Sequence, residues 1–471
     1  MNAGSGFMRR VRQIHFVGIG GAGMSGIAEV LLNLGYTISG SDLVEGETVQ
    51  RLRDSGANIA IGHAAANIRG ADVLVVSTAV SSNNPEVVAA HEQRIPVVPR
   101  AEMLGELMRF REGVAVAGTH GKTTTTSLTA SLLAEAGMDP TFIIGGLVNA
   151  FGSHARLGQG RYVVAEADES DGSFLLLQPV VAVVTNIDRD HMEHYEGSFR
   201  RLREAFLEYL HHLPFYGLAV LNIDDDEVRD LLTEVGRPVL TYGFADDADV
   251  RADNIRQQGL TMTFDLHLPQ HEPLTASIQL PGAHNVHNAL GAAAVAWELG
   301  VPVAKIISGL AAFAGIGRRF AGVGELPLAQ GAVTVIEDYG HHPTELAATL
   351  QAARGAWPQR RLVAVFQPHR YSRTHDLFDE FARVLSVVDV LVVTDIYAAG
   401  EAPLEGVSSP RLCQAVRSRG RVEPVYVPAV RDIPRELPAL LQADDVVLLL
   451  GAGDIGQLAA DMRAHGWGAG S

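Results

Sequence analysis

The stretch GVAVAGTHGKTTTT, residues 113–126, decides the fold. Its small apolar residues predict a buried β-strand, and the glycines, lysine and threonines that follow lead into a helix with Leu128, Leu132 and Leu133 on one face. This order is typical of a phosphate-binding loop, in which backbone N–H groups and a lysine neutralise phosphate and the next threonine binds Mg2+. The loop is short, since Val116 stands where G-x-x-x-x-G-K-[ST] needs its first glycine. The alternative is a threonine-rich helix start with an exposed lysine.

Bulk properties limit the classes of protein that this chain can belong to. At about 150 residues per domain, 471 residues predict roughly three domains. The composition, 47% hydrophobic and 19% charged, is typical of a packed α/β protein and excludes pervasive disorder. A net charge of -17 disfavours a nucleic-acid partner. The single cysteine, Cys413, excludes an internal disulfide framework and fits a reducing compartment, and the sequence has no signal-peptide or membrane-helix pattern. We therefore expect a cytoplasmic protein without membrane insertion.

Three successive series of strand-like and helix-like segments run along the chain. Apolar runs alternate with helical periods over residues 14–99, then from residue 113, and again from residue 332 to the GAG at 451–453, which predicts βαβ units and parallel sheets. Residues 248–282 instead alternate with turn signals, which predicts antiparallel strands at the edge of the second sheet. We expect a linker at residues 109–113 and three domains, at residues 1–107, 108–316 and 317–471.

A second glycine-rich loop follows the first strand. Gly18, Gly20 and Gly23 match G-x-G-x-x-G between a strand and a helix, where backbone N–H groups can approach a pyrophosphate. Asp42, at the end of the next strand, could hold a ribose hydroxyl. The motif does not distinguish NAD from another pyrophosphate ligand, and a plain βα turn is the alternative. A further match, GAGDIG at 451–456, we interpret as a turn.

Acidic and histidine residues follow two strands of the second series. They are Glu166, Asp168, Glu169 and Asp171 after one strand, and Asp188, Asp190, His191 and His194 after another. An acid at the tip of a strand beside a phosphate-loop strand commonly holds nucleotide-bound Mg2+, whereas a solvated loop is the alternative. Each histidine taken singly is more often structural.

Two further groups of polar residues occur later. Asn285 and Asn288 lie three apart at a helix start, where they could read a base or cap the helix. Polar residues at strand ends of the third series face the edge where α/β sheets bind ligands: Tyr339, His341, His342, Arg370 and Arg373.

Together these motifs closely resemble the Mur ligase family, and within it the branch that adds L-alanine to UDP-N-acetylmuramate. The motifs are GIGGAGMSG, GTHGKTTTT, EADESDGSF, TNIDRDHMEHY, GAHNVHNA, EDYGHHPTE and FQPHRYSRT. The resemblance implies Rossmann-like N- and C-terminal domains, for the UDP-sugar and the amino acid, around a central P-loop-type ATPase domain. It implies an ADP-forming ligase for ATP, UDP-N-acetylmuramate and L-alanine in peptidoglycan synthesis, working through an acyl phosphate with Mg2+, or alternatively Mn2+.

The resemblance also implies roles for individual residues. For ATP these are Gly118, Thr119, His120, Gly121, Lys122, Thr123, Thr124, Asn285, Asn288, Arg319 and Tyr339. For the UDP-sugar they are Gly18, Gly20, Gly21, Gly23, Met24, Ser25, Asp42 and His63. The implied metal ligands are Thr123 and Glu166 for one Mg2+, and His191 for a second ion near the substrate carboxylate. The implied catalytic residues are Lys122, His191, His341, Arg370 and Arg373.

One departure from the wider family affects the expected chemistry. Several Mur ligases carry a carbamylated lysine shortly after the DH segment, and Arg203 aligns there instead, so we predict no carbamylation. Three other functions compete with the alanine ligase. They are a murein-peptide recycling ligase, a non-catalytic nucleotide-sugar sensor, and an NAD-dependent dehydrogenase, which would leave the second phosphate loop unused.

Overall fold

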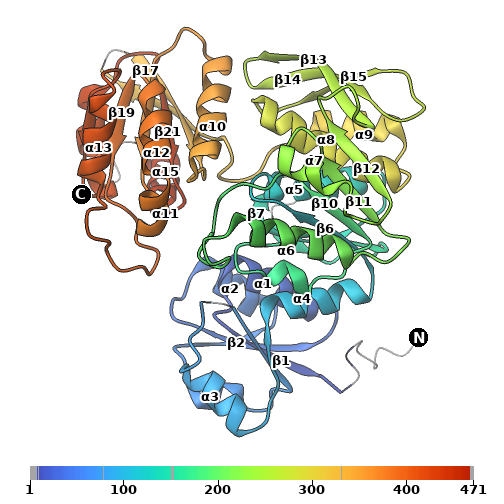
Figure 1. Ribbon diagram of the computed structural model, residues 1–471. Coiled ribbons are helices and arrows are strands. Elements are labelled where there is room, and N and C mark those ends of the chain that lie inside the picture. Colours follow the sequence, from blue (N-terminus) through green and yellow to red (C-terminus); the bar gives the residue numbers. More distant parts are fainter. Residues whose placement is uncertain (1–7, 9, 78, 150–152, 330, 467–471) are drawn as a thin grey trace. The chain divides into compact units, whose positions relative to one another are not determined.

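The computed structural model describes residues 8, 10–77, 79–149, 153–329 and 331–466 and has a three-domain α/β structure with three sheets (Figure 1). The chain divides into two compact units. One contains the residues up to Asp253 with Leu266–Leu274 and His287–Phe313, and the other contains Asn254–Asp265, Thr275–Val286 and the residues from Ala314 onward.

The first sheet is wholly parallel, as the sequence predicts, with strand order β3-β2-β1-β4-β5. Its strands are β1 (Gln13–Val17), β2 (Thr37–Asp42), β3 (Asn58–Ile61), β4 (Val73–Val76) and β5 (Val97–Pro99). The helical segments are α1 (Ala22–Asn33), α2 (Glu47–Asp54), η1 (Ala65–Ile68), α3 (Pro85–Glu92) and α4 (Arg100–Arg109). Successive residues of β1 point to opposite faces of the sheet, and both faces are packed. Ile14 and Phe16 belong to the hydrophobic cluster that includes residues of α1, whereas Val17 belongs to the cluster that includes residues of α3. The strand order reverses between β1 and β4, where open α/β sheets bind ligands.

The second sheet has ten strands in the order β15-β14-β13-β12-β11-β10-β6-β9-β7-β8. They are β6 (Glu112–Ala117), β7 (Thr141–Val148), β8 (Ser153–Arg156), β9 (Tyr162–Glu166), β10 (Val181–Val184), β11 (Leu218–Asn222), β12 (Val239–Gly243), β13 (Val250–Gln258), β14 (Thr261–His267) and β15 (Leu274–Ile278). The helical segments are α5 (Lys122–Glu135), η2 (Ser173–Leu176), α6 (Phe199–His211), α7 (Asp226–Leu231), α8 (Ala283–Glu298) and α9 (Val303–Ala312). The phosphate-loop strand β6 lies inside the sheet, parallel to β9 and β10, and the sheet is mixed because β8 is antiparallel to β7.

The expected linker at residues 109–113 is mostly regular structure, because α4 ends at Arg109 and β6 begins at Glu112. The Arg111 guanidinium donates hydrogen bonds to Thr141 Oγ1 and to the carbonyls of Gly158 and Gly160, at 3.0, 2.8 and 2.5 Å. This arginine therefore ties the segment to the central sheet.

The third sheet has the order β16-β17-β21-β18-β19-β20. Its strands are β16 (Ala321–Leu328), β17 (Gly331–Asp338), β18 (Leu362–Phe366), β19 (Val390–Val393), β20 (Pro424–Tyr426) and β21 (Val446–Leu450). The helical segments are α10 (Pro343–Ala356), α11 (Tyr371–Asp376), α12 (Phe378–Val384), η3 (Leu385–Val387), α13 (Ser409–Ser418), η4 (Val430–Asp432), α14 (Ile433–Glu436), η5 (Leu437–Leu440) and α15 (Ile455–His465). The sequence did not indicate β16, an antiparallel edge strand with a register shift between Gly322 and Gly324. Its glycines and Pro327 weaken the strand signal, and proline is tolerated at such an edge.

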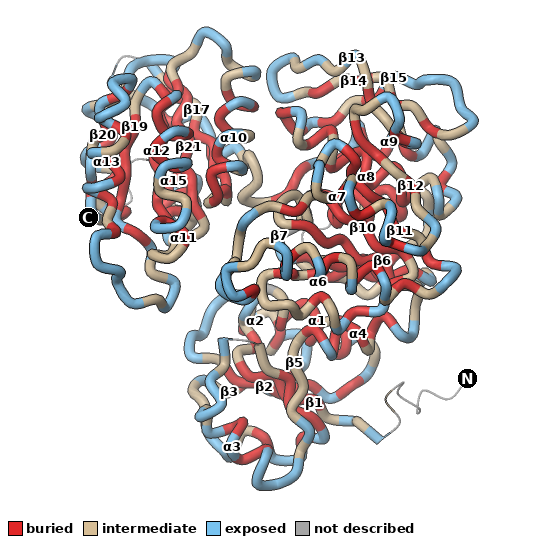
Figure 2. Tube along the Cα trace, in the orientation of Figure 1, coloured by how far each residue is buried: buried red, intermediate tan, exposed pale blue. Residues whose placement is uncertain are grey.

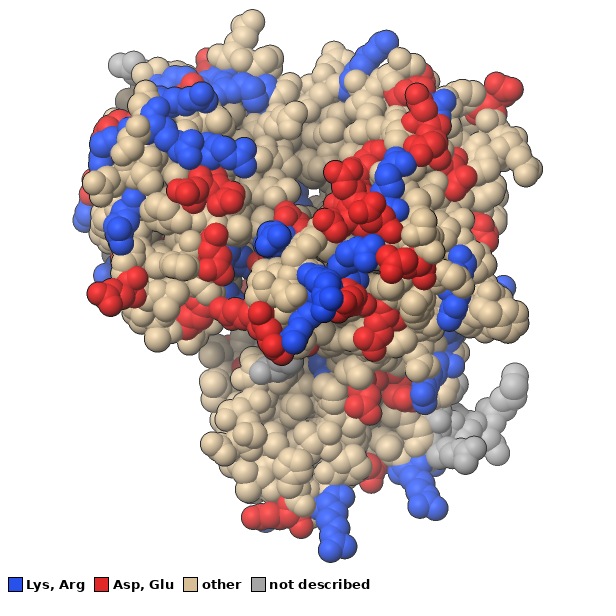
Figure 3. All heavy atoms as spheres, viewed as in Figure 1, with Lys and Arg blue, Asp and Glu red and all other residues tan. Residues whose placement is uncertain are grey.

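The central strands of each sheet run through the buried interior, and exposed residues concentrate in edge strands, helix faces and loops (Figure 2). On the face seen in Figure 3, acidic side chains lie among the basic ones, in keeping with the net charge of -17. Among the described residues, every helix is too short or too polar to cross a bilayer.

Candidate active site

The phosphate loop joins β6 to α5 and is shaped by two glycines. Gly118 and Gly121 have φ angles of +129° and +83°, in the region that disfavours other residues. A Cβ atom at Gly118 would lie 2.0 Å from Thr185 Oγ1, so a side chain there would collide with the loop that follows β10. The motif is therefore folded as a tight strand-turn-helix, and the sequence prediction of this local structure is confirmed.

The loop after β10 holds the phosphate loop in place. The His120 N–H donates to Asn186 Oδ1 at 2.8 Å, and the His120 carbonyl accepts from Asn186 Nδ2 at 2.9 Å and Thr185 Oγ1 at 2.6 Å. The Asp188 N–H donates to Thr119 Oγ1 at 2.9 Å. The Thr-Asn-Ile-Asp motif thus fixes the phosphate-loop backbone.

Lys122 begins α5 and is held against the acidic segment, residues 166–171, that follows β9. Its Nζ donates to the carbonyls of Gly118 (2.6 Å) and Thr119 (3.2 Å) and to both Glu169 oxygens (3.0 and 2.8 Å). Burial alone would lower the pKa of Lys122, but the charges of Glu169, Asp168 and Glu166 outweigh it and raise the pKa. The lysine is therefore a fixed positive charge at the phosphate loop.

The acidic segment is only partly a solvated loop. Glu169 is 2% exposed, and its burial raises its pKa although Lys122 opposes the shift. Burial also acts to raise the pKa of Asp168, but the charge of Lys122 and the Ser170 hydrogen bonds lower it overall, and the Arg100 guanidinium lies 3.6 Å from its carboxylate. Glu166 ends β9 and accepts the Gly145 N–H at 2.8 Å.

The donors of this region fit a hard divalent cation. Thr123 follows Lys122 in the first turn of α5, and Glu166 ends the strand next to β6. A hydroxyl and carboxylate oxygens are the donor types that Mg2+ prefers. The hydrogen bond from the Gly145 N–H orients the Glu166 carboxylate, as hydrogen bonds behind metal ligands commonly do.

His191 has a strained backbone, with φ +53°. Its N–H donates to Asp190 Oδ1 at 2.9 Å, and its Nε2 lies 3.5 Å from Asp190 Oδ2. The other loop histidine, His194, packs edge-on to Tyr195, and its Nε2 lies 2.5 Å from where a Gly172 Cβ would stand.

In the first domain, Asp42 closes the glycine-rich loop. Its Oδ2 accepts the Gly20 N–H at 2.8 Å, and its Oδ1 accepts the Val44 N–H at 3.2 Å. Gly18 has φ +74°, and Gly21 is the N-cap of α1. A Cβ atom at Gly23 would lie 2.5 Å from Arg100 Nη1, which places this guanidinium over the first turn of α1. Arg100 is a residue that the sequence analysis missed, because a lone arginine after Val-Val-Pro matches no motif.

The remaining residues predicted for the UDP-sugar differ in exposure. Met24 and Ser25 are buried, at 3% and 0% exposure, and Met24 belongs to the main core cluster. His63 follows β3, at the same edge of the sheet as Asp42, and its Nδ1 lies 2.9 Å from Ser41 Oγ.

The two asparagines at the start of α8 have different surroundings. Asn285 Nδ2 donates to the Pro281 carbonyl at 2.8 Å. Asn288 Oδ1 accepts from Thr125 Oγ1 at 3.3 Å and lies 2.4 Å from where a Gly121 Cβ would stand. Asn288 thus packs against the start of the phosphate-loop helix. Thr124, on that helix, is 7% exposed.

The third domain carries a second group of predicted residues at the carboxyl ends of its strands. Two neighbouring guanidiniums, of Arg318 and Arg319, lie 4.8 and 5.2 Å from the Tyr339 ring centroid, and Arg319 Nη1 lies 3.7 Å from Glu345. The rings of Tyr339 and His341 meet edge to face at 5.4 Å. No sequence motif pointed to Arg318.

The predicted arginines of this domain are held by neighbouring loops. Arg370 has φ +70°, its N–H donates to the Tyr397 carbonyl at 2.8 Å, and its guanidinium lies 4.0 Å from Glu401. Arg373 is 6% exposed, and its Nη1 lies 3.4 Å from His369 Nδ1. His342 is the N-cap of α10, and its side chain accepts a hydrogen bond from the Thr344 N–H. The GAGDIG turn packs closely, since a Cβ atom at Gly453 would lie 2.4 Å from Gln367 Oε1.

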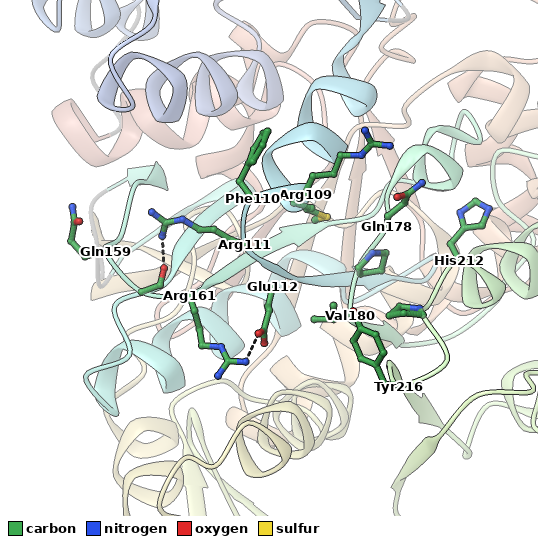
Figure 4. A pocket seen from close by; sticks show the side chains of 14 residues that line it. Arg109, Phe110, Arg111, Glu112, Gln159, Arg161, Gln178, Val180, His212 and Tyr216 are labelled. Carbon is green, nitrogen blue, oxygen red and sulfur yellow. Dashed lines mark hydrogen bonds and ion pairs between the residues drawn. The ribbon is translucent and has the colours of Figure 1, made fainter. Parts of the chain in front are cut away.

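A cavity of about 760 Å³ lies away from these residues (Figure 4). Its lining includes Glu112, at the start of β6, with Arg161 and Val180, which precede β9 and β10, so it opens at the amino ends of strands whose carboxyl ends carry the phosphate loop and Glu166. The guanidiniums of Arg111 and Arg161 there already bind the Gly160 carbonyl and Glu112 (Figure 4). We assign no substrate to it.

Comparison with known proteins identifies the family. Three family models cover most of the chain: Mur ligase family, catalytic domain, at residues 13–112; Mur ligase middle domain at 116–296; and Mur ligase, glutamate ligase domain, at 318–453. This chain belongs to the Mur ligase family. Within that family it is 60% identical over 453 residues to the UDP-N-acetylmuramate–L-alanine ligase of Halorhodospira halophila, covering 96% of this chain and 93% of the relative.

Solved Mur ligase structures have the same fold. The UDP-N-acetylmuramate-alanine ligase of Thermotoga maritima is 30% identical, with a TM-score of 0.78 over 95% of this chain and 97% of that one. The murein peptide ligase of Psychrobacter arcticus is 26% identical, with a TM-score of 0.71 over 97% and 99%.

Arg203, which we expected from the sequence to stand where several Mur ligases have a lysine, lies on α6, and its Nη2 donates to Glu234 Oε1 at 2.7 Å. The chain has only two lysines, Lys122 and Lys305, so the segment after the DH motif offers no lysine for carbamylation.

Proposed function

We propose that this chain joins L-alanine to the lactyl carboxylate of UDP-N-acetylmuramate, with ATP converted to ADP and phosphate, in peptidoglycan precursor synthesis. The observation that carries the proposal is the 60% identity, over nearly the whole chain, to a UDP-N-acetylmuramate–L-alanine ligase. The protein is an ATP-dependent amide-bond-forming ligase.

The reaction has two balanced steps. A lactyl carboxylate oxygen attacks the γ-phosphorus of ATP, and the bond to ADP breaks. The alanine amine then attacks the acyl carbon of the resulting acyl phosphate, phosphate leaves, and the amine loses a proton. Both steps bring anions together, so the protein must mainly position the reactants and neutralise their charge.

We assign phosphate binding to the loop at residues 118–123. The loop leads into the N-terminus of α5, the end of a helix at which phosphate commonly binds, and Lys122 supplies a fixed positive charge beside it. When phosphate oxygens enter, they can replace the Gly118 carbonyl and part of the Glu169 carboxylate as acceptors for Lys122. Asn288, packed against Gly121, and Asn285 are proposed to contact the adenine, with Arg319 and Tyr339 also on the nucleotide.

We further propose that Thr123 and Glu166 bind one Mg2+ and that His191 helps to bind a second ion near the substrate carboxylate, with Mn2+ able to substitute. When bound, the cations would neutralise charge on the transferring phosphoryl group and the attacking carboxylate. Glu166 is oriented for this by the Gly145 N–H, and Asp190 orients His191.

The UDP-sugar is proposed to bind at the first glycine-rich loop. Gly18, Gly20, Gly21 and Gly23 carry no side chains, so the pyrophosphate could approach the backbone closely at the start of α1, and Arg100 stands over the same helix turn. In the third domain, His341, Arg370 and Arg373 are proposed to act on the amino acid and the intermediate, because a guanidinium binds a carboxylate in a fork.

The second candidate is a murein-peptide recycling ligase, because such an enzyme shares the fold at a TM-score of 0.71. The much higher identity to the alanine ligase favours the first candidate. The cytoplasm is the proposed location, in keeping with a single cysteine.

Measuring ADP release with each substrate omitted tests the proposal. We expect sustained ADP release, over many turnovers, only when ATP, UDP-N-acetylmuramate and L-alanine are all present. If a murein tripeptide supports turnover and alanine does not, the second candidate is correct. ADP release independent of the nucleotide sugar would exclude both.

A further inference from the structure

A network of polar side chains is buried under α3 in the first domain. Ile14 and Phe16 pack on one apolar face of the sheet, so the side chain of His15, between them, lies on the opposite face. On the neighbouring strand, Ser39 and Ser41 lie on the same face as His15. All three are buried, and α3 presents the fully buried carboxylate of Glu86 to them. Neither the sequence motifs nor the proposed reaction uses Glu86.

Glu86 is well supplied with hydrogen-bond donors. Its Oε1 accepts from the Ala64 N–H at 3.3 Å and from Asn67 Nδ2 at 2.5 Å, and its Oε2 accepts from Ser41 Oγ at 2.6 Å. Burial alone would raise the pKa of Glu86, but the His15 side chain, whose Nε2 lies 3.5 Å away, and the hydrogen bonds from Ser41 and Asn67 lower it to about 2. The carboxylate is therefore ionised at neutral pH and can only accept.

The ionised carboxylate decides where the protons of its neighbours lie. Ser41 has one hydroxyl proton, and the 2.6 Å contact with Glu86 uses it. Ser41 Oγ also lies 2.9 Å from His63 Nδ1, so that nitrogen must be the donor. Neutral His63 then carries its proton on Nδ1, and its Nε2, on the opposite side of the ring, has a lone pair.

The same carboxylate fixes the backbone that carries His63. Ala64, the next residue, donates its N–H to Glu86, and Asn67 donates from one amide group to both Glu86 and the Gly62 carbonyl, the latter at 3.0 Å. The ring of His63 remains partly exposed, at 18% of its side chain, at the sheet edge proposed for the nucleotide sugar.

We propose that Glu86 is a positioning residue: through Ser41 it holds His63 as the Nδ1–H tautomer, so that His63 Nε2 accepts a hydrogen bond from a hydroxyl or N–H group of the nucleotide sugar. The inference rests on the proposed function for the identity of that ligand. The cost of burying an ionised carboxylate is offset by the hydrogen bonds that it accepts from Ser41, Ala64 and Asn67.

Histidine-selective 15N NMR of the full chain tests the tautomer, with the His63 signals assigned by their loss in His63→Asn. We expect the Nδ1–H tautomer in the free protein at pH 8. In Ser41→Ala we expect a shift toward the Nε2–H form, which free histidine favours. An Nε2–H tautomer in the unsubstituted protein, or no change in Ser41→Ala, would overturn the proposal.

Steady-state kinetics distinguishes a positioning role of Ser41 and Glu86 from a purely structural role. Ser41→Ala and Glu86→Gln should each raise the KM for UDP-N-acetylmuramate about tenfold, the value of one hydrogen bond, with the KM for ATP unchanged. Glu92→Gln, on the exposed end of the same helix, is the matched control and should change neither. An equal rise in both KM values would mean a structural role only. If Glu86→Gln does not fold, Ser41→Ala carries the test, and the NMR result stands even if the ligand proves to be a different nucleotide.

Discussion

Lys122 offers the sharpest test of the phosphate loop. Its charge is expected to contribute both to catalysis and to the stability of the fold, and the two contributions can be measured separately. Lys122→Met keeps much of the side-chain volume and removes the charge. Loss of one preorganised charge at the transferring phosphoryl group should lower kcat by about 10²–10³-fold or more. Binding of UDP-N-acetylmuramate in the absence of ATP should be unchanged.

The same substitution leaves Glu169 buried without its counter-charge. Breaking a buried pair from one side costs on the order of 3–5 kcal/mol, which urea unfolding at pH 8 would measure. Burial raises the pKa of Glu169 above its ordinary 4.5, and loss of Lys122 raises it further. The folded variant therefore keeps a proton that the unfolded chain has released, so its stability falls as the pH rises above 4.5. The loss should be smaller at pH 5 than at pH 8.

Two further variants complete the test. Adding Glu169→Gln to Lys122→Met should recover most of the stability and none of the activity. Lys305→Met, which changes the chain's other lysine in an exposed pair with Glu135, should alter neither. ADP production at a near-normal rate by Lys122→Met, measured with a coupled assay, would remove the phosphate-binding assignment.

Four other outcomes are expected. Glu166→Gln should raise the Mg2+ concentration needed for half-maximal turnover, and an unchanged Mg2+ titration would exclude Glu166 as a ligand. Arg373→Ala should raise the KM for alanine far more than that for ATP, and the opposite pattern would place Arg373 on the nucleotide. Gly20→Ala should raise the KM for the UDP-sugar, because the new Cβ would lie 2.8 Å from Asp42 Oδ2; unchanged calorimetric affinity would contradict this. Burial raises the pKa of Asp225 to about 6, so its contribution to stability falls as the pH rises from 3.8 toward 6, and Asp225→Asn should stabilise the protein at pH 8 in thermal unfolding.

Sequence patterns predicted the features that depend on local order. The strand, glycines and Lys-Thr at residues 113–126 specify a tight strand-turn-helix, because only glycine fits the backbone angles and the space beside Thr185. The edge strands between residues 248 and 282 were likewise visible, since alternation with period two is a local property.

Pairings between distant segments could not be predicted in the same way. Arg100, at the start of α4, reaches the first glycine-rich loop and Asp168 after β9, and Glu86 on α3 meets Ser41 and His63. These contacts form only because the tertiary fold brings together segments that are far apart in the sequence. Neither residue belongs to a sequence motif. A buried glutamate in particular looks like an ordinary exposed residue of a helix start, and only its burial shows otherwise.

Oxygen transfer tests the central claim most directly. UDP-N-acetylmuramate labelled with 18O in the lactyl carboxylate is incubated with ATP, L-alanine and the protein, and the phosphate released is examined by mass spectrometry. Formation of an acyl phosphate predicts one 18O atom in each phosphate, because the carboxylate oxygen that attacks the γ-phosphorus leaves with it. Phosphate without 18O, released together with the alanyl product, would contradict the account.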